Sequence, residues 1–153
     1  MSERTDLIPH IIKHGDGYHI GMVSPVAPTP LPAMVFRPRI TKDGLFLAKD
    51  RNRFDVPHIL YGVKYPKISK IIMDDYARTK KSLGVLLTGA KGMGKSLLSE
   101  VLGNEMIDKG FPVLYITEEL PASAISEFIK VLGPCCVILE EFDKIYNWDK
   151  TPA

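Results

Sequence analysis

The sequence predicts an α/β fold in which helices flank a parallel sheet and a small region containing a β-hairpin precedes it. From about residue 59 onward, apolar strand-like runs alternate with amphipathic stretches, as in right-handed βαβ units. Before that point, a proline-rich segment at 24–32 excludes a helix or a central strand and favours an extended linker. We therefore expect an N-terminal appendage at 1–57 and a larger core at 58–153.

The appendage carries weak signals for regular structure up to about residue 33. Apolar and basic side chains then alternate from Met34 to Ile40. The residues Lys42-Asp43-Gly44 supply turn chemistry, and an apolar run follows at 45–47. This pattern predicts a β-hairpin.

The core is predicted to alternate helices with buried strands. Its helical segments place apolar residues at helical spacing, and its strand segments are near-continuous apolar runs, as in strands covered on both faces. The end of the second helix at Gly110 and the opening of the third at Pro121 agree with known helix boundary preferences. The predicted elements are a helix at 67–80, a strand at 84–88, a helix at 95–109, a strand at 111–117, a helix at 121–132 and a strand at 135–139.

Composition places the chain among ordinary globular proteins. It has 153 residues, of which 45% are apolar and 25% charged, with a formal net charge of +2. No apolar run approaches the roughly 20 residues that a membrane span requires, and the polar N-terminus leads into no signal peptide. We expect no membrane partner and a reducing, cytoplasmic location. Cys135 and Cys136 are then small buried strand residues rather than a disulfide or a metal site.

A glycine-rich loop is the strongest functional signal. Residues 89–96 match the pattern G-x-x-x-x-G-K-[ST] at every fixed position, between an apolar run and an amphipathic helix. The glycines let successive amides point at phosphate oxygens, and the helix N-terminus adds positive potential. Lys95 would neutralise the β and γ phosphates, and Ser96 would bind Mg²⁺. The predicted site for ATP and Mg²⁺ comprises Gly89, Ala90, Lys91, Gly92, Met93, Gly94, Lys95, Ser96 and Leu97.

Acidic residues end the last predicted strand. Glu140 and Glu141 follow the apolar run at 135–139, where a strand end beside the loop could hold the water shell of Mg²⁺. Glu140 is then the metal-side acid, and Glu141 is the candidate base that polarises the attacking water. The alternative is an acidic loop without a catalytic role.

Together, the loop and the acidic strand end resemble the Walker A and Walker B elements of P-loop ATPases, particularly the AAA+ group, over residues 58 to 148. In that group an Asp usually stands where Glu140 stands, whereas Glu141 and Asp143 fit the pattern. The resemblance implies an AAA+ type P-loop sheet. It also implies that Tyr61 and Gly62, within 59–62, flank adenine, although core packing would explain them equally.

The later motifs of the AAA+ group, which are a sensor strand, an arginine finger and a helical lid, have no counterpart before Ala153. The resemblance places the absent fourth strand between the first and third, so we expect either a gap, a differently closed sheet or a fragment of a longer product. It also implies a homo-oligomeric ring or a partner protein that completes the core. ATP binding is a safer prediction than hydrolysis, because an arginine finger contributes strongly to turnover.

The leading functional hypothesis is an ATPase that remodels a macromolecular partner. Residues 103–117 are similar to helicase-loader ATPases, which suggests replication work. Two alternatives are a nucleotide-binding regulatory module without turnover and a P-loop kinase. Nucleic acid is a possible partner for the basic stretch from Arg37 to Arg53, whose alternative is a solvated face.

Overall fold

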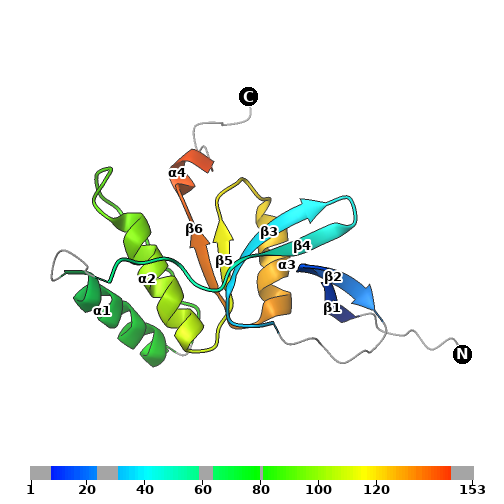
Figure 1. Ribbon diagram of the computed structural model, residues 1–153, viewed down its shortest axis with the longest axis horizontal. Coiled ribbons are helices and arrows are strands. Elements are labelled where there is room, and N and C mark those ends of the chain that lie inside the picture. The colour runs from blue at the N-terminus through cyan, green and yellow to red at the C-terminus, as the bar shows by residue number, and fades with distance from the viewer. Residues whose placement is uncertain (1–7, 24–30, 59–63, 80, 146–153) are drawn as a thin grey trace, which may run out of the picture.

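The computed structural model describes residues 8–23, 31–58, 64–79 and 81–145. It contains one six-stranded sheet with the strand order β1-β2-β4-β3-β5-β6 and helices on both of its faces (Figure 1). The elements are β1 (Ile8–His14), β2 (Gly17–Val23), β3 (Val35–Thr41), β4 (Gly44–Arg51), α1 (Lys64–Thr79), α2 (Lys95–Asp108), β5 (Val113–Ile116), α3 (Ala122–Leu132), β6 (Cys136–Leu139) and α4 (Phe142–Ile145).

Two β-hairpins build the N-terminal part of the sheet. The hairpin predicted at 34–47 is present as β3 and β4, with Thr41 opposite Gly44 across a two-residue turn. The hairpin of β1 and β2 lies where the sequence carries weak signals. Its turn places His14 opposite Gly17, and Gly15 adopts a φ of 57°, a left-handed value that glycine accepts readily. Pairing of β2 with β4 joins the two hairpins into four antiparallel strands in the order β1-β2-β4-β3.

The sheet is mixed, so the predicted parallel P-loop sheet with flanking helices is wrong. Among the described strands β3, β5 and β6 run parallel to one another, whereas all pairs among β1 to β4 are antiparallel. Apolar runs identify buried strands, but they do not specify which strand pairs with which. Here β3, from the N-terminal region, lies beside β5 and continues the sheet across the boundary expected at residue 57.

The segment 84–88 is not a strand, which corrects a second prediction. Its residues have no regular secondary structure, and the side chains of Val85 and Leu86 are 46% and 80% exposed. A strand needs a neighbour that accepts its backbone hydrogen bonds. Both sides of β5 are taken, by β3 and β6, and the segment between α1 and α2 does not pair with the outer side of β6.

Alternating side chains divide the core between the two faces of the sheet. Val35 and Val113 point toward α1 and α2, where they pack with Met73 and Met106. The next residues along the strands, Phe36 and Leu114, point the other way, toward Phe128 of α3. This period of two is the geometry of a strand buried on both faces.

The helices predicted in the core are present as α1, α2 and α3, with ends that differ by a few residues from the expected ranges. α1 packs on α2, and α2 packs on β5 and β6. Cys136 lies on β6 and packs against the core under α2, and both cysteines are free thiols. Within the described ranges, no helix combines the length and the apolar character needed to cross a bilayer.

Candidate nucleotide site

The glycine-rich loop lies between the exposed segment 84–88 and α2, and its glycines adopt backbone angles that other residues avoid. Gly92 and Gly94 have φ values of 81° and 76°, and Gly89 has a φ of 151°. The Met93 N–H donates to the Ala90 oxygen at 3.3 Å, which closes a turn at the loop tip. The chain therefore reverses direction immediately before α2.

The N-terminus of α2 follows directly from this reversal. Its Leu98 N–H donates to the Gly94 oxygen at 3.0 Å. The amides of the preceding three helical residues belong to the first turn, whose N–H groups have no acceptor within the helix. The positive end of the 14-residue helix is thus presented at the loop.

Lys95 folds back over the loop that precedes it. Its Nζ donates to the Gly89 oxygen at 2.8 Å and to the Ala90 oxygen at 2.9 Å. The ammonium group is therefore placed by the loop backbone. A cation that pairs with no carboxylate of the described residues is suited to attract an anionic phosphate chain.

Ser96 and Glu140 lie 44 residues apart in sequence and meet in space. The Ser96 Oγ in the first turn of α2 donates a hydrogen bond to Glu140 Oε1. The Glu140 backbone is fixed because its N–H donates to the Ile116 oxygen at 3.0 Å, which extends the pairing of β5 and β6 by one residue. The two predicted metal-side residues are thus brought together.

The donors of this pair fit Mg²⁺. Magnesium prefers oxygen ligands and is usually bound through one or two carboxylates, with substrate phosphates and water completing its shell. A hydroxyl and one carboxylate beside a phosphate-binding loop supply that partial set. Within the described ranges, no group of three or more His, Cys, Asp or Glu residues is placed to hold a metal ion.

Negative charge accumulates around Glu140. Partial burial and the Glu140 carboxylate raise the pKa of Glu100. Burial, followed by Glu140 and Glu100, also raises the pKa of the Tyr115 hydroxyl, whereas Arg37 and Arg51 oppose that shift. A divalent cation at Glu140 would relieve this repulsion.

Glu141 points elsewhere. Its carboxylate pairs with the Lys144 Nζ at 2.5 Å, and its φ of 47° turns the chain from β6 into α4. The hydrogen bond that the Lys144 Nζ donates to Glu141 raises the pKa of Lys144. The structure therefore does not bring the predicted base to the Ser96–Glu140 pair. Both acids follow the end of β6 at Leu139, and the left-handed turn at Glu141 separates their side chains.

Tyr65 is a loop contact that the sequence analysis missed. This residue lies in the first turn of α1, and its hydroxyl donates to the Met93 oxygen at 3.3 Å. A β-carbon at Gly94 would lie 1.8 Å from the same hydroxyl. No local pattern marks Tyr65, because its role depends on how α1 packs against α2.

The other predicted contacts divide into three groups. Lys91 and Met93 are exposed at the loop tip, whereas Leu97 is half-buried in α2. The predicted adenine contacts Tyr61 and Gly62 lie outside the described residues.

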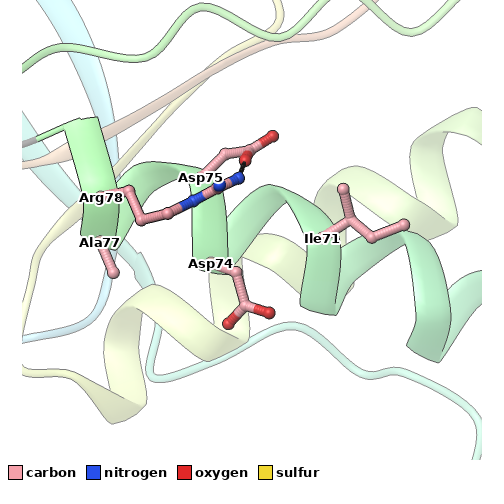
Figure 2. A pocket seen from close by; sticks show the side chains of 5 residues that line it. All are labelled: Ile71, Asp74, Asp75, Ala77 and Arg78. Carbon is pink, nitrogen blue, oxygen red and sulfur yellow. Dashed lines mark hydrogen bonds and ion pairs between the residues drawn. The ribbon is translucent and has the colours of Figure 1, made fainter.

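A separate open hollow lies along α1 and includes no loop residue (Figure 2). It is lined by Ile71, Asp74, Asp75, Ala77 and Arg78.

Comparisons of the chain with protein-family models, with curated proteins and with solved structures gave no significant match.

Proposed function

We propose that this protein binds ATP together with Mg²⁺ at the loop of residues 89–96. The observation that carries the proposal is the meeting of Ser96 with Glu140. The local sequence around Ser96 or Glu140 does not predict the contact between them. A phosphate-binding loop followed by a hydroxyl that meets a distant strand-end carboxylate matches the donors required by a triphosphate and its metal ion.

Each part of the site has a distinct role in the proposal. Loop amides and the first turn of α2 bind phosphate oxygens, and Lys95 exchanges its contacts with Gly89 and Ala90 for the phosphate chain. Ser96 and Glu140 hold the metal ion. Magnesium, when bound, neutralises phosphate charge and orients the triphosphate.

Affinity for ATP measured with Mg²⁺ and with EDTA tests this assignment. We expect Mg²⁺ to strengthen binding by wild type, and Ser96→Ala or Glu140→Gln to remove most of that gain. Ser99→Ala is the matched control, because the Ser99 Oγ lies one turn along α2 and donates to the Ser96 backbone oxygen at 2.7 Å. An equal Mg²⁺ effect in all four proteins would refute the metal assignment.

We further propose that ATP hydrolysis drives the remodelling of a macromolecular partner, in an oligomer or with a second protein that completes the site. In this proposal Glu141 activates water after release from Lys144. Phosphate release should then fall at least about tenfold in Glu141→Gln while ATP affinity is retained.

A second candidate is nucleotide binding without turnover. The ion pair between Glu141 and Lys144 favours it, because that pair holds the candidate base away from Ser96. Equal, negligible phosphate release by wild type and Glu141→Gln, with ATP binding intact in both, would select this candidate.

A further inference from the structure

The four antiparallel strands β1 to β4 carry an open face on the side of the sheet that faces α1 and α2. Cross-strand pairing places Ile12, His19, Phe46 and Arg39 in one row that crosses all four strands. On the opposite side of the same strands, Tyr18 and its neighbours pack beneath α3. In the open row Arg39 is exposed and Ile12 is 39% exposed, so the helices with described positions leave this face accessible (Figure 1).

Aromatic rings form the centre of this open face. The ring centroids of His19 and Phe46 are 4.7 Å apart, and those of His14 and His19 are 5.2 Å apart. Gly17 makes the arrangement possible, because a β-carbon there would lie 2.1 Å from the Phe46 ring. The missing side chain lets the Phe46 ring extend over the neighbouring strand.

Positive charge borders the rings along β3. Arg39 ends the row beside Phe46, and Arg37 ends the next row, opposite Ala48. The Arg37 guanidinium is held in place by Asp50 at 2.8 Å and by the Thr117 hydroxyl at 3.1 Å.

Residues 11–51 as a whole carry an excess of positive charge. Their basic side chains are Lys13, Arg37, Arg39, Lys42, Lys49 and Arg51, against the acidic Asp16, Asp43 and Asp50.

We propose that this face binds single-stranded nucleic acid. Unpaired bases would stack on the rings of His14, His19 and Phe46, while Arg39 would pair with the phosphate backbone. Exposed and half-buried aromatic rings on one face of four strands, bordered by cations, suit this ligand because every base offers a stacking face and every linkage a negative charge. A duplex hides its base faces, and an acidic peptide offers no regular series of planar rings.

Fluorescence anisotropy of a labelled single-stranded oligonucleotide of about 12 nucleotides tests the proposal with the full chain. DNA and RNA versions are titrated at about 50 mM salt and then at higher salt. Phe46→Leu keeps an apolar side chain but removes the ring, and it should weaken binding at least about fivefold. Arg39→Gln should weaken binding and reduce the slope of log affinity against log salt by about 0.7.

Lys49→Gln is the matched control for Arg39→Gln. It removes the same charge from the adjacent strand, but Lys49 lies on the opposite face, over the Tyr18 ring at 5.8 Å. It should have a much smaller effect. Lys95→Ala should leave oligonucleotide affinity unchanged, so this proposal and the proposed ATP site can fail separately.

Four outcomes would overturn the proposal. These are no binding by wild type, unchanged affinity in a folded Phe46→Leu, equal weakening by Arg39→Gln and Lys49→Gln, and a duplex or polyglutamate that competes as well as the single strand. Circular dichroism checks that each variant is folded. If Phe46→Leu is unfolded, His14→Ala replaces it as the ring deletion, because His14 is exposed at the end of β1, and unchanged affinity in that variant would equally refute stacking.

Discussion

Replacing Gly94 with alanine should disable the phosphate loop through two separable effects. The residue has a φ of 76°, and a left-handed conformation costs a non-glycine residue about 1 to 2 kcal/mol. The added β-carbon would also lie 1.8 Å from the Tyr65 hydroxyl and 2.8 Å from Tyr65 Cζ. Tyr65 must therefore rotate away and lose its hydrogen bond to Met93, which costs about 1 kcal/mol.

Together these terms predict that Gly94→Ala weakens ATP binding by roughly 2 to 3 kcal/mol, or about 30- to 150-fold. Isothermal titration of wild type, Gly94→Ala, Tyr65→Ala and the double variant separates the terms. In the Tyr65→Ala background only the backbone strain remains, so the effect of Gly94→Ala should shrink by about 1 kcal/mol. Equal effects in both backgrounds would show that the contact is unimportant, and unchanged affinity in Gly94→Ala would refute the loop geometry.

Three further predictions concern other parts of the fold. Burial raises the pKa of Cys136 to about 12, so alkylation of this thiol at about pH 8 should be slow in the native protein and fast in urea; equal rates would contradict its place in the core. The pKa of Glu100 is higher in the folded protein than its ordinary value of 4.5. As the pH rises above about 4.5, Glu100 therefore ionises more readily in the unfolded chain, and the free energy of unfolding falls. Glu100→Gln should therefore raise the melting temperature more at about pH 7 than at about pH 4, and the opposite order would contradict the burial of Glu100 and its repulsion by Glu140. In Gly103→Ala, the new β-carbon would lie 2.7 Å from Phe54 and 3.1 Å from Ile138. Chemical denaturation should show a loss of about 1 to 3 kcal/mol, whereas a gain from higher helix propensity would show that α2 packs less closely on β6.

The sequence predicted those features that depend on local chemistry. Helical spacing located α1, α2 and α3, and turn residues located the hairpin of β3 and β4. The loop pattern named Lys95 and Ser96, and the acidic strand end named Glu140, which the structure places beside Ser96. The roles of these residues in binding ATP and Mg²⁺ stay predictions.

The errors concern partners that are distant in sequence. The apolar run at 84–88 has the composition of a buried strand, but whether it enters a sheet depends on a free neighbouring edge. Here β3 and β6 take both sides of β5, and the run does not join the outer side of β6. The first hairpin carried one usable signal, the pair Gly15-Asp16 between strand-like residues, which is typical of a two-residue turn.

The most direct test of the account is the affinity for Mg-ATP of Lys95→Ala beside Lys91→Ala. Both variants remove one cation from the same loop, but Lys91 is exposed at the loop tip, whereas Lys95 Nζ is held against the Gly89 and Ala90 carbonyls. We predict at least about a tenfold loss in Lys95→Ala, because a charge-assisted contact contributes about 1.5 to 3 kcal/mol, and little change in Lys91→Ala. Wild-type affinity in Lys95→Ala would contradict the proposed site.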